Sequence, residues 1–446
     1  MQVRNWTQGV TFKAMGVGVL ALLMLIPLAQ VQSLTAERQG LEGEARARIA
    51  ERWGGLQMVG GPVLVVPVRH QVQSDKGWIS QDESRYLLPE RLAVKGTLAT
   101  EVRQYGIYAT PIYTATLGLS GQFRADALAA LSALGGEPQW ARAVLRIPVS
   151  DVRGIRSLSA MKIDGAEIAF GPGSEGLGNI TATEIAWPIQ TDGAAVDHAF
   201  AFDLRLAGTA KLKFLPLARE TDVTLSGSWS DPSFAGAFLP DRHSGDKAGF
   251  EAHWQVLDLN RSYGQQGSVA ELNAFTLQQS AFGVELFQPV GTYQRNERAG
   301  KYGILFIALS FVALFLFEAL GRWRVHPVQY LMVGLALCTF YVVLLALSEQ
   351  IGFAWAYAIA ALAVVAIIAG YAAAASRTRR AGATLGALLA LVYVLLYGLV
   401  ISEQYSLLMG AIALLAAISA LMYLTRRVDW YGLGLGADNP AGRMPS

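Results

Sequence analysis

The sequence predicts an α+β membrane protein in which six transmembrane helices accompany a large β-rich, sandwich-like domain between the first and second helices. Three observations support this prediction: an apolar run near the start, a polar middle with short strand patterns, and a C-terminal third with few charges. Hydrophobic residues make up 53% of the 446 residues and charged residues 16%, whereas soluble domains carry about 25% charged residues. The last lysine of the chain is Lys301. Water is therefore the expected solvent for the middle of the chain, and lipid for its end.

The first apolar run, Ala14–Leu34, has about the 20 residues that a helix needs to cross a bilayer. No cleavage site of the A-x-A type follows it, so we interpret it as an uncleaved anchor. Arg4 and Lys13 precede it and should remain in the cytoplasm. We therefore expect the chain after residue 34 to be exported.

The apolar segments after the polar middle predict five further spans with connections that alternate in charge. Arginines occur in 321–326, in 376–381 and directly after the last span, whereas 348–350 and 402–404 contain no lysine or arginine. The positive-inside rule requires this alternation when six spans leave both termini inside. The five spans are Tyr302–Leu320, Pro327–Leu347, Ile351–Ala375, Ala383–Ile401 and Tyr405–Leu424. The expected organisation of this multi-pass inner-membrane protein is a cytoplasmic N-terminus (1–13), a transmembrane anchor (14–34), a periplasmic β-rich domain with a helical stalk (35–301), a five-helix bundle (302–424) and a cytoplasmic tail (425–446).

Two of these connections share a sequence, Leu347-Ser348-Glu349-Gln350 and Ile401-Ser402-Glu403-Gln404. Spans three and four therefore resemble spans five and six in the same orientation. Parallel repeats occur in some transporters, but two similar apolar hairpins can also arise from composition alone.

The polar middle begins with the stalk. Ala36–Arg52 is rich in Ala, Glu and Arg, and Gly54-Gly55 should end this helix. Beyond it, β-branched and aromatic runs are separated by Gly and Pro, which favours short strands in a sandwich-like arrangement. Pro67 suits an edge strand or a bulge, and Asp126–Leu134 is expected to be a short helix. The strand candidates are Val63–Arg69, Gly106–Phe123, Ala143–Val149, Ala199–Leu206 and Val223–Trp229.

The residues carry no enzyme signature. No G-x-S-x-G, H-E-x-x-H or Walker A pattern occurs, and the five histidines are too scattered to suggest a metal site. His243 and His253 would suit an acid–base pair, although a polar loop and a strand histidine explain them as well. We therefore predict no catalytic residue, no metal and no cofactor. The net charge of +2 without a basic run gives no indication of nucleic-acid binding, and the single cysteine, Cys338, excludes an intramolecular disulfide.

An aromatic segment is the main candidate for a partner-binding surface. Three large aromatic residues and two prolines occur between Trp229 and Pro240, and His253-Trp254 follows shortly after. One interpretation is an aromatic-lined binding surface, and the other is a strand–turn–strand unit whose rings fill the core. The candidate partner-binding residues are Trp229, Phe234, Phe238, His253 and Trp254.

Three acidic residues lie at the ends of predicted spans: Glu318, Glu349 and Glu403. A charge at the centre of a membrane helix costs roughly 2.5–3.5 kcal/mol on insertion scales, so the position at a span end favours an interfacial role. Glu318 and Arg322 are four residues apart and are predicted to pair. A proton or substrate path through Glu349 and Glu403 is the alternative.

The chain resembles the family of inner-membrane protein CreD, also described as colicin-tolerance or cell-envelope-integrity proteins of Gram-negative bacteria. The matching residues run from end to end and include Gly61-Pro62, Leu88-Pro89-Glu90, Gly106-Ile107-Tyr108, Asp151-Val152-Arg153-Gly154-Ile155, the segments Trp229–Pro240 and Gly249–Trp254, Lys301-Tyr302, Phe317-Glu318, His326-Pro327, Leu344–Glu349 and Leu424-Thr425-Arg426-Arg427. The resemblance implies a cytoplasmic-membrane protein linked to the envelope-stress response. It implies no catalytic residue and no binding site.

Three functions are then open. The first is a non-enzymatic protein of envelope integrity whose periplasmic domain binds an envelope protein, a lipid or peptidoglycan, in addition to the lipid bilayer around its helices. The second is a transporter or lipid-handling protein that uses the C-terminal bundle, and the third is a periplasmic hydrolase. The sequence does not fix the ligand or the oligomeric state.

Overall fold

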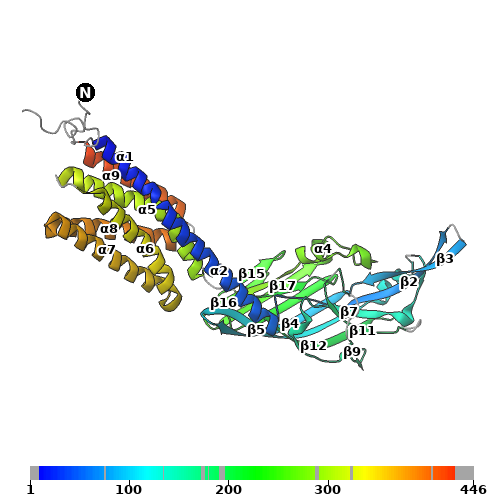
Figure 1. Cartoon of the computed structure of the whole chain (residues 1–446). Coiled ribbons are helices and arrows are strands. Elements are labelled where there is room, and N and C mark those ends of the chain that lie inside the picture. Colours follow the sequence, from blue (N-terminus) through cyan, green and yellow to red (C-terminus); the bar gives the residue numbers. More distant parts are fainter. Residues whose placement is uncertain are drawn as a thin grey trace, which may run out of the picture. The chain divides into compact units, whose positions relative to one another are not determined.

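The chain folds into two units, which we describe separately. The helical unit comprises Met1–Glu42 and Val290–Ser446, and the β unit comprises Gly43–Pro289. The structure is a computed structural model (Figure 1), and it describes residues 10–74, 77–133, 135–171, 176–178, 180–189, 196–286, 291–321, 325–402 and 405–426.

The helical unit contains the predicted spans. Within the described residues, six helical segments are long and apolar enough to cross a membrane, the first being formed by α1 and α2 together. The helices are α1 (Val10–Leu23), α2 (Leu25–Trp53, which continues into the β unit), α5 (Thr292–Gly321), α6 (Pro327–Ile351), α7 (Phe353–Ser376), α8 (Arg379–Ile401) and α9 (Ser406–Thr425). The prediction of six apolar helices with a β-rich region between the first and second is therefore confirmed.

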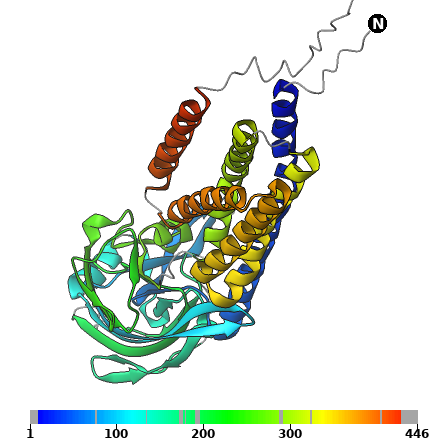
Figure 2. The ribbon, with the colours of Figure 1, turned by 90° about the vertical axis from the view of Figure 1, so that its left-hand side faces the viewer.

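Aromatic residues pack the middle of the helical unit. Phe340 of α6 lies with its ring centroid 5.2 Å from that of Tyr357 in α7 and 4.7 Å from that of Tyr393 in α8. In contrast, the described residues of α9 include no buried side chain, and this helix (red in Figure 2) lies at the margin of the bundle. α6 and α7 pack closely, whereas α8 and α9 touch at few residues. The two similar connections therefore do not produce two equivalent hairpins, which favours composition as their origin.

The strands of the β unit form three sheets among the described residues. Sheet A has the order β1 (Gln57–Gly60), β13 (Lys211–Leu215), β19 (Phe282–Leu286), β15 (Pro232–Gly236). Sheet B has the order β11 (Ala182–Ala186), β7 (Val144–Pro148), β2 (Val63–Ser74), β3 (Gly77–Leu87), β18 (Gln266–Ser268), with β6 (Glu137–Pro138) on β2. Sheet C has the order β10 (Ala166–Ile168), β9 (Met161–Ile163), β12 (His198–Thr209), β5 (Tyr108–Phe123), β4 (Arg91–Tyr105), β14 (Glu220–Gly227), β17 (Gly249–Leu257), β16 (Arg242–Asp246), with β8 (Ile155–Leu158) on β12. Two short helices, α3 (Ala125–Ala133) and α4 (Ala274–Gln279), complete the unit.

The strand patterns explain this arrangement. In β4 and β12 buried and exposed residues alternate, as expected for strands with one face on the core and one in water. Side chains from all three sheets, including Leu64, Leu117, Phe214 and Trp254, contribute to one continuous core. The predicted strands correspond to β2, β5, β7, β12 and β14, and the predicted helix at 126–134 corresponds to α3.

Of the two alternatives for Pro67, the edge strand is wrong, because β2 lies inside sheet B between β3 and β7. Leu64 and Val66 face one core and Val63 and Val65 face another, so β2 is buried on both sides. Pro67 is accommodated at a gap on one side of β2, where pairing with β7 ends at residue 65 and pairing with β6 begins at residue 68.

The C-terminal end of α2 is fixed to the β unit, as the predicted stalk helix requires. The Trp53 ring lies under two guanidinium groups, 4.5 Å from that of Arg103 and 4.7 Å from that of Arg156, and its Nε1 donates to the Tyr113 carbonyl at 3.2 Å. The helix ends at Gly54, whose φ of +128° favours glycine.

Candidate functional site

The structure places the aromatic candidates mainly in the core. Trp254 is completely buried, and its ring centroid lies 5.7 Å from that of Phe234 and 5.9 Å from that of Phe282. Phe238 also packs on Phe282, at 5.9 Å. Together with the half-buried Trp229, these rings close the space between sheets A and C. Trp254 is therefore unavailable to a partner, and this position is corrected to a core residue.

The two histidines of the segment do not form a pair. Arg242 lies opposite His253, and His243 lies opposite Ala252. Since successive side chains of a strand point to opposite faces, His243 and His253 project from opposite faces of sheet C. His253 Nε2 instead lies 2.9 Å from Asp222 Oδ2 on the exposed face.

An open groove of about 610 Å³ lies beside this aromatic segment, between the middle of β4, the C-terminal ends of β14 and β16, and the start of β17. Phe250 contributes its apolar surface, and its ring centroid is 6.1 Å from that of Phe234. The other lining residues are mainly small, hydroxyl-bearing or acidic: Thr97, Leu98, Ser226, Gly227, Ser228, Ser244, Gly245, Asp246, Ala248, Gly249 and Glu251. The Asp246 carboxylate accepts hydrogen bonds from the backbone N–H groups of Ala248 and Gly249 at 2.7 and 3.1 Å, which fixes the turn at the rim.

Two of the residues that line the groove are glycines that pack closely against neighbouring groups. A Cβ atom on Gly249 would lie 2.2 Å from the Gly227 carbonyl oxygen, and one on Gly227 would lie 2.7 Å from the Phe250 ring. Both positions therefore require glycine. Of the sequence candidates, Trp229 and Phe234 adjoin the groove without lining it, and the lining serines were missed because single serines at strand ends carry no sequence signal.

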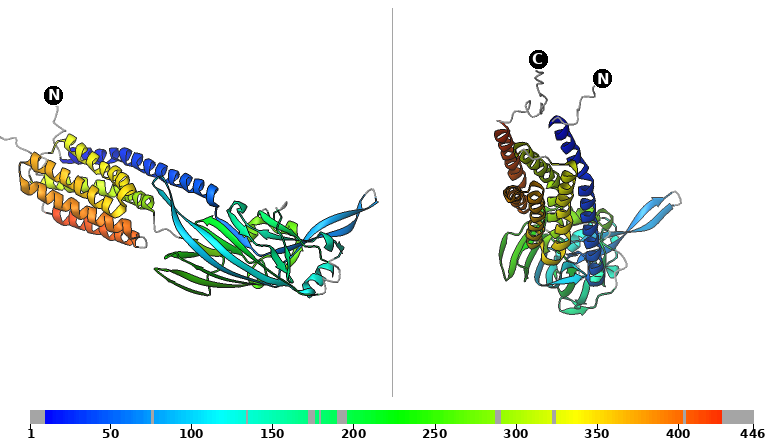
Figure 3. Two further views of the ribbon diagram at one scale, coloured as in Figure 1. Left: turned by 90° about the horizontal axis from the view of Figure 1, so that it is seen from below. Right: turned by 60° about the vertical axis from the view of Figure 1, so that its left-hand side comes forward.

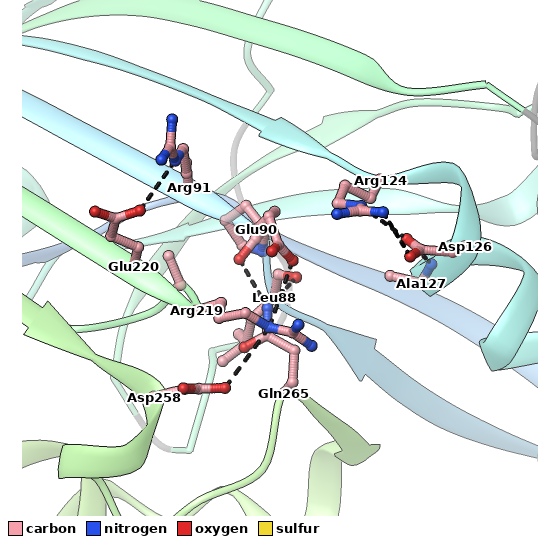
Figure 4. A network of polar contacts seen from close by, with 12 residues as sticks. Leu88, Glu90, Arg91, Arg124, Asp126, Ala127, Arg219, Glu220, Asp258 and Gln265 are labelled. Carbon is pink, nitrogen blue, oxygen red and sulfur yellow. Dashed lines mark hydrogen bonds and ion pairs between the residues drawn. The ribbon is translucent and has the colours of Figure 1, made fainter.

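A second polar group of residues surrounds Leu88-Pro89-Glu90, where the chain passes from sheet B to sheet C (Figure 4). Gln265 Nε2 donates to the carbonyls of Leu88 and Pro89 at 2.8 and 2.7 Å. Arg219 pairs with Glu90 at 3.4 Å and with Asp258 at 3.6 Å. These residues therefore hold the sheets together, which gives them a structural role.

The segment Asp151–Ile155 has a similar role at the end of α2. The Asp151 carboxylate accepts hydrogen bonds from the Gly55 N–H at 2.9 Å and from the Arg153 side chain at 2.9 Å. The Arg153 hydrogen bonds, assisted by the backbone N–H groups, hold the pKa of Asp151 below its ordinary value although burial opposes this shift.

In the helical unit, Glu318 is 8% exposed and bridges three helices. It pairs with Lys13 of α1, and it accepts hydrogen bonds from the Val325 N–H and the Tyr330 hydroxyl, both at 2.9 Å. The predicted partner, Arg322, lies outside the described residues. The sequence did not indicate Lys13 as a partner, because the two residues are 305 positions apart.

Glu349 is the centre of a second polar cluster. Its Oε1 accepts a hydrogen bond from the Tyr293 hydroxyl at 2.9 Å and lies 4.0 Å from Arg38 Nε. Next to it, Asn296 Nδ2 donates to Ser348 Oγ at 2.9 Å. Glu403 lies outside the described residues, so the predicted pair of Glu349 and Glu403 stays a prediction.

Little in the described part of the chain indicates a cofactor site. There, no three His, Cys, Asp or Glu side chains are close enough to bind a metal ion. One cavity between α5, α6, α7 and α8 holds about 10 Å³ and is lined mainly by apolar side chains such as Leu314, Val333 and Ile368.

Comparison with known proteins identifies the family. The model of the family "Inner membrane protein CreD" matches residues 9–431. The chain is 34% identical over 425 residues to the inner membrane protein CreD of Escherichia coli (strain K12), covering 93% of this chain and 92% of that protein. With six helical segments suited to spanning a membrane, it is a multi-pass inner-membrane protein. The chain therefore belongs to the CreD family, as the resemblance in its sequence predicted.

Proposed function

We propose that the β unit lies in the periplasm and binds an envelope component in the groove beside Phe250, while the helical unit anchors it in the inner membrane. In this proposal the protein has a non-enzymatic role in envelope integrity. The groove carries the proposal, because it is a preformed concave surface in a unit that continues into membrane helices at both ends of its chain.

The orientation is supported by charge and by the two glutamate clusters. Lys13 near the start of the first span pairs with Glu318 near the end of α5. Arg38 near the end of the first span and Tyr293 at the start of α5 both contact Glu349. The first span and α5 are therefore antiparallel, as six spans with cytoplasmic termini require. The arginine-containing connections then lie in the cytoplasm, in agreement with the positive-inside rule.

The lining of the groove favours a ligand that is neutral or positively charged. Four hydroxyl groups can donate and accept hydrogen bonds, the small exposed part of Phe250 is apolar, and Asp246 and Glu251 add negative charge. No Lys or Arg is among the lining residues, so phosphate groups would find no cationic partner there. A glycan strand or an extended peptide segment suits this surface better than an anionic lipid headgroup.

The helical unit gives less support for transport. Glu349 is occupied by Tyr293, and the cavity found between the helices has room for only about one water molecule. A hydrolase is also less well supported, because His243 and His253 project from opposite faces of sheet C.

Photo-crosslinking in living cells tests the proposal. A photoreactive residue at Ser226, which lines the groove, should give defined adducts with a periplasmic protein or with glycan, whereas the same residue at Ser120 should not. Ser120 is the matched control because it is an exposed serine on the same face of sheet C. Peptidoglycan digestion separates glycan adducts from protein adducts.

The complementary test fills the groove. The variant Ser226→Trp should lower binding of the full-length protein in nanodiscs to isolated peptidoglycan, or to the crosslinked protein, at least tenfold, and Ser120→Trp should leave it unchanged. Equal crosslinking at both positions, or unchanged binding by Ser226→Trp, would contradict the proposal.

A further inference from the structure

The distal part of the β2–β3 hairpin projects beyond the other strands of the β unit (Figures 1 and 3). Trp78 is 70% exposed and Ile79 is 48% exposed. They are neighbours in β3 and therefore point to opposite faces of the hairpin. Two large apolar side chains are therefore exposed at one tip, one on each face of the hairpin.

The outer edge of β3 is open along this part of the hairpin. β18 pairs with β3 only at Arg85–Leu87, while β2 occupies the other side from Gly77 to Leu87. Backbone N–H and C=O groups on an open edge form a template for another strand. A ribbon of two strands is also only marginally stable in water until a third strand or another element covers it.

Two other sheet edges in the described residues are protected by charges or proline, and this one is not. The edge strand β16 contains Arg242 and Asp246, and the edge strand β15 begins with Pro232. Charges and proline prevent edge-to-edge pairing. Between Gly77 and Gln81 the edge of β3 contains neither.

We propose that this edge pairs with the same edge of a second copy of the chain. In the pairing the two β3 strands are antiparallel, and a two-fold axis passes beside Ile79. Ile79 then lies opposite Ile79 of the second copy, and Trp78 lies opposite Ser80 of the second copy. The interface is of the isologous kind that closes a dimer.

The sequence around Ile79 is complementary to itself in this register. In an antiparallel ribbon every second residue turns its N–H and C=O outward. Residues 78 and 80 are two positions apart, so their N–H and C=O groups point to the same edge of the strand. Pairing residue 78 with residue 80 of the second copy therefore brings the free backbone groups of both strands together. Asp82 falls beyond the central pairs and is already paired with Arg142 and Arg69 at 2.6 and 3.2 Å. Residues 77–81, which form the central pairs, carry no charge in either copy, which favours a second copy over a partner of strong charge.

Cysteine crosslinking tests the register in native membranes. Cys338 is the only cysteine and is buried, so Cys338→Ala gives a cysteine-free background. Directly opposite side chains of antiparallel strands have Cβ atoms about 4.5–5.5 Å apart, within reach of a short bis-maleimide. Ile79→Cys should form at least tenfold more crosslinked dimer than Ser120→Cys. If both cysteines react with a monofunctional maleimide but give equal amounts of dimer, the proposal is overturned.

Charge exchange tests the two-fold axis. Like charges directly opposite each other destabilise strand pairing. Two Ile79→Lys copies should therefore no longer co-purify, and two Ile79→Glu copies should not co-purify either. A mixture of tagged Ile79→Lys and untagged Ile79→Glu copies should recover it. Since residue 79 is half exposed, both variants should fold. Unchanged co-purification of the Ile79→Lys copies, or no recovery in the mixture, would refute the pairing.

Discussion

Two long hairpins of the β unit end in exposed apolar residues, but only one is held by a helix. The tip of the β4–β5 hairpin lies against α2, where Arg48 Nη1 donates to the Tyr105 hydroxyl at 3.0 Å and Arg103 covers the Trp53 ring. The tip of the β2–β3 hairpin is supported only up to Asp82, by Arg69 and Arg142.

The difference shows that a similar strand pattern serves two purposes. The β4–β5 hairpin, together with Gly154 and Asp151, fixes the orientation of the stalk helix on the β unit. The β2–β3 hairpin offers its edge to another molecule. Substitutions at the first hairpin and its junction should therefore affect the stability of the isolated chain, and substitutions at the second should affect association.

The largest effect on the free energy of unfolding is expected from a substitution of Gly154, which packs beneath the end of α2. A Cβ atom there would lie 2.3 Å from the Ala207 carbonyl oxygen and 2.3 Å from Gln57 Nε2. Gly154→Ala should therefore lower the free energy of unfolding by about 3 kcal/mol, the upper end of the usual cost of overpacking. Urea titration of the full chain in detergent, followed by tryptophan fluorescence, measures this loss.

The matched control is Gly43→Ala, within α2, where a Cβ atom would meet nothing within 4 Å. Alanine is favoured over glycine in a helix, so this variant should gain about 0.5–1 kcal/mol. Equal stabilities of the two variants would show that the junction is looser than the structure indicates.

Trp53→Ala should cause the next largest loss of unfolding free energy. It removes the hydrogen bond to the Tyr113 carbonyl and both guanidinium contacts. At about 1 kcal/mol for the hydrogen bond and about 0.5 kcal/mol for each exposed cation–π contact, the loss should be about 2 kcal/mol. Hydrogen exchange should then accelerate in residues 101–105 of β4 while residues 77–82 of β3 are unaffected. Equal acceleration in both hairpins would contradict the distinction between them.

The stability of the same junction depends on pH through the ionisation of Asp151. Because its pKa is lowered in the folded state, its contribution to stability is complete above the ordinary aspartate pKa of about 3.9. The contribution is lost as the pH falls through the lower folded-state pKa. Asp151→Asn should therefore lower the unfolding free energy at pH 7 by about 1 kcal/mol. The melting temperatures of the two proteins should approach each other as the pH falls below about 3.9 towards the lowered folded-state pKa; a constant difference in melting temperature at all pH values would contradict this.

The sequence predicted the parts of this fold that depend on local pattern. Runs of apolar residues identified the membrane helices, Gly54-Gly55 identified the end of the stalk, and β-branched and aromatic runs separated by Gly and Pro identified strands such as β5 and β12. The family resemblance was recognised from scattered residues, and the structure gives many of them a packing role. Leu88-Pro89-Glu90 and Asp151–Ile155 join elements that are distant in sequence.

The sequence could not predict features that depend on distant pairs. Pro67 suggested an edge, but β7 reaches β2 from 80 residues away and covers it. For Glu318 the sequence indicated Arg322, which lies outside the described residues, and gave no sign of the partner Lys13 on another helix. The sequence left the aromatic segment open as a binding surface or as a core-filling unit, and only the three-dimensional packing shows that Trp254 lies in the core. The groove is lined by residues of four strands, so no single stretch of sequence reveals it.

The smallest effect on stability is expected at the free hairpin. Trp78→Ala removes a side chain that is 70% exposed, so the unfolding free energy of the chain in detergent should change by less than about 0.5 kcal/mol. Trp53→Ala provides the contrast, since it removes the same type of side chain from the junction. In native membranes the order should reverse: Trp78→Ala should reduce crosslinking through a cysteine at position 79, because Trp78 lies opposite Ser80 of the second copy, and Trp53→Ala should not. A large loss of stability in detergent would show that Trp78 is packed within its own chain, and the second hairpin would then resemble the first.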